Sequence, residues 1–181
     1  LGLGRTVVAV MPENTSLVAD DAATRKAGVD HLKASVDACR ELGAEAMAGP
    51  IYHPVGALIG RGPTTDEWKR LAECMREVAE YAAKDGPLLS IEPLNRFETY
   101  VLNAQQDAAR VARDVGLDNV GILYDTFHAN IEEKNINAAI HGAGKTINHV
   151  HISANDRATP GEDHVDWETT FRALKDVGYE G

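Results

Sequence analysis

The feature that most constrains the fold is a repeat of roughly 30 residues, the length of a βα unit. Apolar, β-branched runs typical of buried strands occur at residues 6–10, 44–50, 87–92, 119–125 and 147–153. Helical patterns alternate with them at residues 24–42, 65–84, 104–115, 133–143 and 167–177. Glycines that permit a left-handed helix cap stand near the helix ends, at Gly43, Gly86, Gly116, Gly144 and Gly178. The repeat therefore predicts a parallel sheet with crossover helices.

The loops of this repeat are asymmetric. The turns that lead from helix to strand are short, whereas the segments that lead from strand to helix are long and polar. Long loops at the carboxyl ends of parallel strands mark the functional face of a (β/α)8 barrel. A doubly wound sheet is the alternative, but no G-x-G-x-x-G pattern follows the first strand.

Five predicted strands are fewer than the eight that a complete barrel needs. The sequence also begins almost directly in a strand, without an initiator methionine, and ends just after a helix. We therefore expect residues 1–181 to form a single α/β domain of the TIM-barrel type, with about five βα units. We expect the first two strands and the last strand of the barrel to lie outside the sequence.

Composition limits the partners that the chain can have. The formal net charge of −10 argues against nucleic acid or an anionic membrane surface, since phosphate binding depends on clustered Lys and Arg. No apolar run has transmembrane length. Cys39 and Cys74 both fall in helical patterns, as small core residues in a reducing compartment do, so we expect a cytoplasmic protein.

Three successive predicted strands end on residues that commonly bind metals. Glu92 closes "LLSIE", Asp125 closes "VGILYD", and His151 lies in "HVHIS". Because the carboxyl ends of adjacent parallel strands meet at one edge of a sheet, we expect these side chains to lie together. Two carboxylates and an imidazole suit a divalent cation such as Mn²⁺, Co²⁺ or Mg²⁺. His149, two residues before His151, points to the same side but lies deeper, and we expect it to pack behind the site.

Each of these residues has a simpler interpretation when it is taken alone. A strand-end Glu often pairs with Arg, a strand-end Asp often caps a helix or turn, and a strand-end His is usually a hydrogen-bonded core residue. In the long loops, Glu98, His128 and Arg157 follow the three candidate ligands closely. They could hold the hydroxyls of a sugar-like substrate, or they could be solvated loop residues.

Three segments resemble the ketose 3-epimerases of the tagatose/psicose type, in the xylose-isomerase-like superfamily. They are "IEPLNRFETYVLN", "GILYDTFHANIEE" and "HVHISANDR" with the following "PG" and "HVDW", in this order along the chain. The resemblance implies a (β/α)8 barrel with a divalent metal, with Mn²⁺ as the first expectation and Co²⁺ or Mg²⁺ as alternatives. It implies a ketose substrate and a homo-oligomer, either a dimer or a tetramer.

Carried over by motif, the resemblance implies that Glu92, Asp125 and His151 bind the metal. It implies that Glu98, His128 and Arg157 contact substrate, and that Glu92 is also one of two catalytic glutamates. In the family, the second catalytic glutamate is the fourth metal ligand and lies on the eighth strand. We expect that strand to lie beyond Gly181.

The reaction that the resemblance implies is inversion of C3 of a free ketose through an enediolate. An aldose–ketose isomerase of the hydroxypyruvate-isomerase type is one alternative, because it shares the enediolate. A DNA-repair enzyme related to endonuclease IV is another, and the acidic charge argues against it. A third alternative is a catalytically dead incomplete barrel that associates with other chains through its exposed sheet edges.

Overall fold

The computed structural model describes residues 3–181 and contains one five-stranded parallel sheet in the order β1-β2-β3-β4-β5. The strands are β1 (Thr6–Val8), β2 (Ala46–Gly49), β3 (Leu88–Ile91), β4 (Val120–Asp125) and β5 (Ile147–His151). Each strand pairs with the next strand along the chain. This arrangement confirms the predicted βα repeat, since neighbouring parallel strands must be joined by crossover segments.

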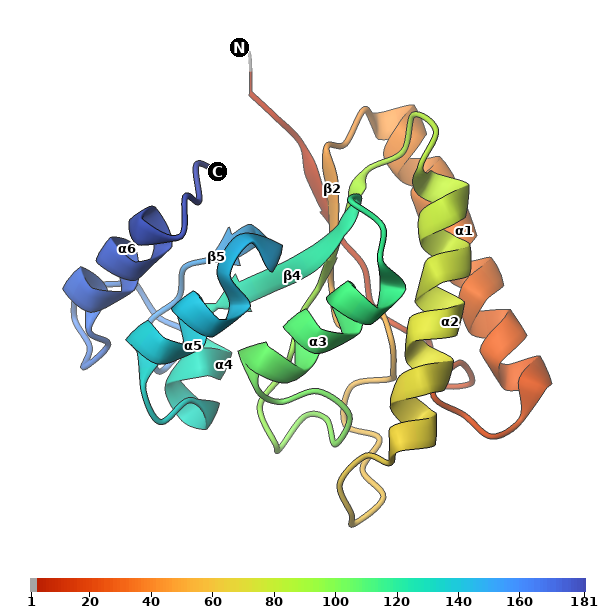
Figure 1. Cartoon of the computed structure of the whole chain (residues 1–181), viewed down its shortest axis with the longest axis horizontal. Helices are drawn as coiled ribbons and strands as arrows, with labels where there is room; N and C mark the ends of the chain where they lie inside the picture. The colour runs from red at the N-terminus through yellow and green to blue at the C-terminus, as the bar shows by residue number, and fades with distance from the viewer. Residues whose placement is uncertain (1–2) are drawn as a thin grey trace.

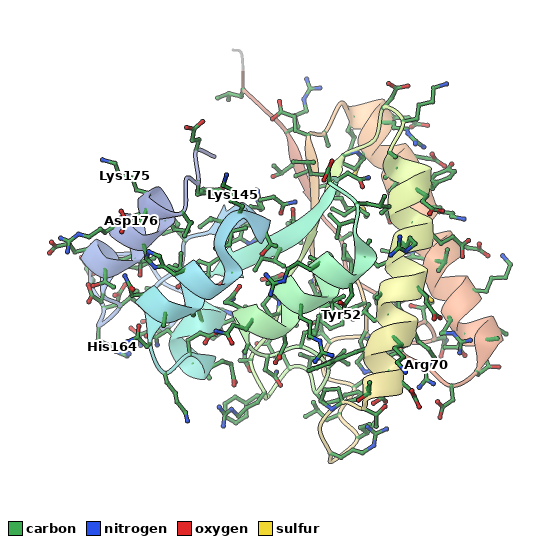
Figure 2. The ribbon with its side chains drawn as sticks, in the orientation of Figure 1. Tyr52, Arg70, Lys145, His164, Lys175 and Asp176 are labelled. Carbon is green, nitrogen blue, oxygen red and sulfur yellow. The ribbon has the colours of Figure 1, made fainter. Side chains whose placement is uncertain are left out.

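Five of the six α-helices in residues 3–181 pack against one another in chain order along the sheet, and the fourth contacts β4 (Figure 1). The helices are α1 (Ala22–Leu42), α2 (Thr65–Ala82), α3 (Gln105–Val115), α4 (Thr126–Glu132), α5 (Ile136–Ala143) and α6 (Trp167–Asp176), with a short 3-10 turn, η1 (Gly144–Thr146). The apolar faces of α1, α2, α3 and α5 bury a single core against the sheet. Tyr52 lies inside this core, whereas Lys175 and Asp176 project from the outer side of α6 (Figure 2).

Local signals explain where several helices begin and end. Thr64 and Glu67 form the predicted capping box at the start of α2, each side chain accepting from the backbone N–H of the other residue. Gly43 and Gly116 end α1 and α3 in the left-handed conformation, as expected. After α2 the left-handed residue is Asp85, not Gly86. Gly86 is needed for another reason, because a Cβ there would lie 2.4 Å from the carbonyl oxygen of Ala82.

One helix was not predicted. Residues 126–132 were expected to be part of a loop, but they form α4, and the helix expected from residue 133 begins at Ile136. The cause is Asp125, whose side chain caps α4 by accepting from the backbone N–H groups of Phe127 and His128. Among residues 3–181, no helix is both long enough and apolar enough to cross a bilayer.

Candidate active site

The three candidate ligands lie at the carboxyl edge of the sheet, on adjacent strands. Glu92 directly follows β3, and its backbone N–H donates to the carbonyl of Gly49 on β2 (3.0 Å). Asp125 ends β4 and stands directly beside His151, which ends β5, in the strand register. The parallel pairing of β3, β4 and β5 therefore brings together side chains that are far apart in the sequence.

Asp125 has two roles at this edge. Its Oδ1 accepts from the backbone N–H groups of Phe127 (2.7 Å) and His128 (3.4 Å), which fixes the start of α4. Its Oδ2 faces Nδ1 of His151 at 3.8 Å. The helix-capping interpretation and the metal-ligand interpretation are therefore compatible, because each uses a different oxygen.

Glu92 is buried next to other carboxylates. It is 6% exposed, and Asp125 is 9% exposed. Burial is the main cause that raises the pKa of Glu92 to about 8, and the negative charges of Asp125 and Glu98 act in the same direction. The nearest cationic candidate is His128, whose Nε2 lies 3.7 Å from Oε1 of Glu92. Burial lowers the pKa of His128, so this imidazole does not compensate the carboxylate with a full positive charge.

The donor atoms are spaced as a divalent cation requires. One ligand atom from each of Glu92, Asp125 and His128 lies within 4.8 Å of the others. Ligands about 2.1 Å from a shared cation lie about 3–4 Å from one another, close to the 3.8 Å between Asp125 and His151. His128 is 4% exposed, whereas the His151 side chain is 34% exposed. The residue types and their spacing fit a divalent cation, and the identity of the third ligand stays a prediction.

Of the predicted substrate-binding side chains, His128 belongs to this cluster, whereas Glu98 and Arg157 contact each other on the neighbouring loops. The Arg157 guanidinium donates to Oε1 of Glu98 (2.7 Å) and lies 4.1 Å above the centre of the Phe127 ring. Arg157 has a positive φ of 64°, which is uncommon for a residue with a side chain. Glu98 and Arg157 therefore face each other across the mouth of the site, on loops that follow β3 and β5.

Sequence reasoning missed the residues that connect these loops. Asn95 bridges the β3–α3 loop to α4, since it contacts both Glu98 and His128. Glu132 of α4 accepts from the backbone N–H (2.7 Å), Nε (3.0 Å) and Nη2 (2.9 Å) of Arg96. Both residues lie in the segments that carry the family resemblance, which is the only signal in the sequence that points to them.

The remaining histidines lie away from the site or behind it. His149 packs edge-to-face on His151, with ring centres 5.1 Å apart, as expected for a residue deeper in β5. His31, His53, His141 and His164 make local hydrogen bonds to other partners. Ser16 pairs with His53 in the most buried of these contacts, Oγ to Nδ1 at 2.9 Å.

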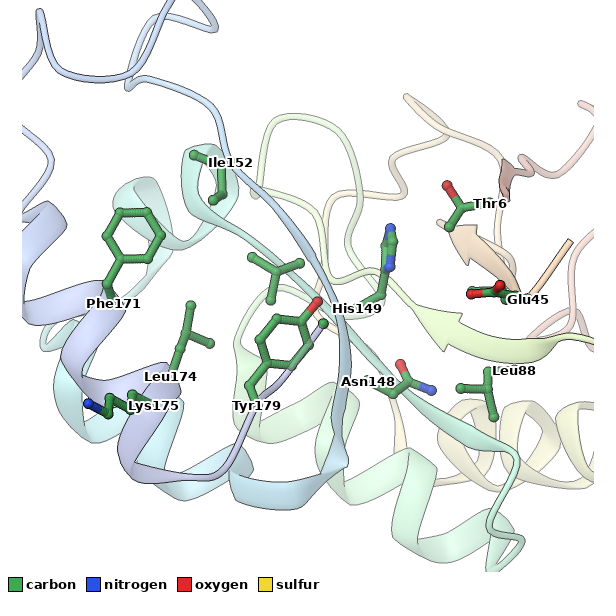
Figure 3. A pocket seen from close by; sticks show the side chains of 13 residues that line it. Thr6, Glu45, Leu88, Asn148, His149, Ile152, Phe171, Leu174, Lys175 and Tyr179 are labelled. Carbon is green, nitrogen blue, oxygen red and sulfur yellow. The ribbon is translucent and has the colours of Figure 1, made fainter. Parts of the chain in front are cut away.

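A cavity of about 550 Å³ lies between α6 and β5 and extends to the amino ends of β1, β2 and β3. Figure 3 shows Phe171, Leu174 and Tyr179 on one side of it and Thr6 and Glu45 on the other. The cavity reaches His149 and Ile152, which flank His151 in the sequence, but its lining does not include Glu92, Asp125 or His151.

Comparison with known proteins identifies a matching family and several relatives of similar sequence. The model of the xylose isomerase-like TIM barrel family matches residues 2–181. An L-ribulose 3-epimerase from Mesorhizobium japonicum is 37% identical over 180 residues, which cover 99% of this chain and 60% of the relative. A ketose 3-epimerase from Arthrobacter globiformis is 32% identical over 180 residues, which cover 99% of this chain and 62% of the relative.

Solved structures of 3-epimerases superpose closely on this chain. A D-psicose 3-epimerase from Clostridium cellulolyticum H10, solved with D-tagatose, superposes with a TM-score of 0.92 at 31% identity. The match covers 99% of this chain and 63% of that one. An L-ribulose 3-epimerase superposes with a TM-score of 0.92 at 34% identity, over 98% of this chain and 60% of that one. The chain thus spans about three fifths of the length of the relatives it matches, and the predicted incomplete barrel of about five βα units is confirmed.

Proposed function

The chain belongs to the xylose isomerase-like TIM barrel family, and from this premise we propose that it carries the metal-binding edge of a ketose 3-epimerase. The proposed reaction inverts C3 of a free ketose through an enediolate. The observation that carries the proposal is the carboxyl edge of the sheet, where ligand atoms of Glu92, Asp125 and His128 lie within 4.8 Å of one another and His151 lies 3.8 Å from Asp125. The 3-epimerase relatives supply the reaction class.

Glu92 is the proposed proton-transfer group. A carboxylate positioned beside the reacting carbon can remove a proton as a general base and return it as a general acid. Asp125 and His151 would hold the cation together with Glu92. When bound, a divalent cation polarises the substrate carbonyl and stabilises the negative charge of the enediolate.

Glu98, His128 and Arg157 are the proposed substrate contacts. Glu98 and Arg157 hold each other at 2.7 Å and present acceptor and donor groups from opposite loops. His128 lies beneath them, against Glu92. A polyhydroxylated substrate offers both donors and acceptors, so this mixed set suits the hydroxyls on either side of a ketone.

Four further features belong to the proposal. We propose Mn²⁺ as the metal, because the expected ligands are carboxylates and imidazole without thiolates. We propose a single domain over residues 1–181, supported by one continuous core. We propose a cytoplasmic location, since Cys39 and Cys74 are free thiols. We also propose a homo-oligomer, for which the two unpaired sheet edges are the support.

The test is the rate at which the Glu92→Gln variant epimerises free ketohexoses in the presence of Mn²⁺. The variant is made in the full-length protein that contains residues 1–181. Loss of a proton-transfer group predicts that the rate of epimerisation falls by about 10²–10⁴-fold. Glu45→Gln is the matched control, because Glu45 directly precedes β2, at the amino end of the sheet. We expect this variant to keep the parental rate. Unchanged epimerisation in Glu92→Gln would contradict the assignment. An aldose as the main product would identify an aldose–ketose isomerase instead.

A further inference from the structure

Asn95 lies between two of the proposed substrate contacts and is almost completely buried, with 2% of its surface exposed. Its backbone N–H and its side-chain Nδ2 are each 3.0 Å from Nδ1 of His128. The same Nδ2 is 3.0 Å from Oε1 of Glu98. One residue therefore holds both an acid and an imidazole of the site.

The orientation of the Asn95 amide follows from its other contacts. A backbone N–H can only donate, so the amide oxygen Oδ1 must be the atom that faces the N–H of Phe97, at 3.0 Å. The amide nitrogen is then the atom that faces Glu98. With the amide fixed in this way, the group that it turns toward His128 is a donor.

Two donors on one ring nitrogen determine where the imidazole proton lies. A neutral imidazole has one protonated nitrogen and one nitrogen with a free lone pair. Because the backbone N–H and the Nδ2 of Asn95 can only donate, Nδ1 of His128 must be the acceptor. The proton is then on Nε2, which lies 3.7 Å from Oε1 of Glu92.

We propose that Asn95 is a positioning residue that holds His128 in the Nε2–H tautomer. His128 then presents an N–H donor to the site in place of a lone pair. A protonated ring nitrogen cannot coordinate a cation, so His128 binds a substrate oxygen although it lies within ligand distance of Glu92 and Asp125. The substrate role rests on the proposed function, whereas the tautomer does not.

The experiment is a long-range ¹H–¹⁵N correlation spectrum of the chain labelled with ¹⁵N-histidine, under conditions in which His128 is neutral. The signals of His128 are identified by their loss in His128→Gln. We expect an unprotonated Nδ1 and a protonated Nε2. A protonated Nδ1 in the parent chain would overturn the proposal, whatever the result of the epimerase assay.

Asn95→Asp tests the side chain, because it replaces the donor by an acceptor of the same shape. A carboxylate about 3 Å from Nδ1 favours a proton there, whereas the backbone N–H of residue 95 still donates to Nδ1, so we expect the Nδ1 signal to move toward the protonated range. The matched control is Asn103→Asp in the same loop, since Asn103 donates to the carbonyls of Leu94 and Thr99. We expect this control to keep the parental tautomer.

Asn95→Ala covers the case in which the Asp variant does not fold. It removes one of the two donors and leaves the backbone N–H, so we expect a measurable fraction of the Nδ1–H tautomer. Parental spectra in both Asn95 variants would show that the side chain does not set the tautomer, and would overturn its positioning role. A working epimerase with the opposite tautomer would refute this inference and leave the proposed function intact.

Discussion

Glu92 is the residue whose environment departs most from that of an ordinary carboxylate. It is buried beside Asp125 and Glu98, and its pKa is raised to about 8. A carboxylate in an apolar setting is costly unless a positive charge accompanies it. A cation between Glu92 and Asp125 would supply that charge, which is the physical reason to expect one there.

The raised pKa of Glu92 predicts how stability changes with pH in the metal-free chain. Between about pH 4.5 and pH 8 the folded protein keeps a proton that the unfolded chain has lost. Stability therefore falls as pH rises through this window, with a contribution of up to about 1.4 kcal/mol per pH unit. Glu92→Gln removes the contribution, and we expect its stability to exceed that of the parent increasingly toward pH 8.

Urea unfolding at pH 5, 6, 7 and 8 in the presence of a chelator measures this difference. Glu45→Gln is the control, because Glu45 is an exposed glutamate at the other edge of the sheet. We expect it to follow the parental pH dependence. Parallel curves for Glu92→Gln and the parent would show that Glu92 does not carry a proton in the folded state.

At the scale of elements, the two acids that follow His128 join α4 to the preceding loop and helix. Glu132 binds Arg96 in the β3–α3 loop. Glu133 accepts from the backbone N–H of Gln105 at 2.7 Å, at the start of α3, where Ala104 provides no side-chain cap. The loop that carries Asn95 and Glu98 is therefore anchored from α4 and not only by its own sequence.

This anchoring predicts that Glu133→Ala destabilises the chain. The first turn of α3 would lose the acceptor that satisfies one of its free N–H groups, at a cost of about 1 kcal/mol. Glu133→Gln keeps an oxygen acceptor at the same position, so we expect a smaller loss. Denaturant midpoints of the two variants measure the difference. Equal stability of Glu133→Ala and the parent would show that the long-range cap contributes nothing.

The sequence predicted most elements because their signals are local. The capping residues Thr64 and Glu67 and the glycine Gly43 act on neighbours in the chain, so the sequence pattern reveals them. Helix α4 was missed although capping was one interpretation of Asp125, because the segment after it was read as a loop that leads to a helix at residue 133. The contacts of Asn95 and Glu133 cross between elements, and no periodic pattern in the sequence marks such contacts.

At the scale of the molecule, the parallel order of the strands followed from the repeat, and the convergence of Glu92, Asp125 and His151 followed from that order. The roles of the loop residues could not be derived in the same way. The contact between Glu98 and Arg157 depends on how two long loops fold over the edge of the sheet. The family resemblance implied a substrate role for each residue but did not predict their contact with each other.

The open sheet has a further consequence for residues 1–181 studied on their own. Within the described residues, β1 and β5 each pair with one neighbour, so each strand presents an unpaired edge. Phe171 and Ile152, which are about half exposed, line the cavity beside β5. We expect concentration-dependent association in light scattering. Monodisperse monomers up to high concentration would contradict this expectation.

Mn²⁺ binding followed by electron paramagnetic resonance tests whether Glu92, Asp125 and His151 hold one divalent cation. We predict saturable binding of one Mn²⁺ per chain, weakened at least about tenfold (about 1.4 kcal/mol) in Asp125→Asn and in His151→Gln. The asparagine keeps an oxygen that can cap α4, which separates metal binding from folding. His128→Gln should retain the cation. Absence of saturable binding, or binding unchanged in Asp125→Asn, would contradict the account.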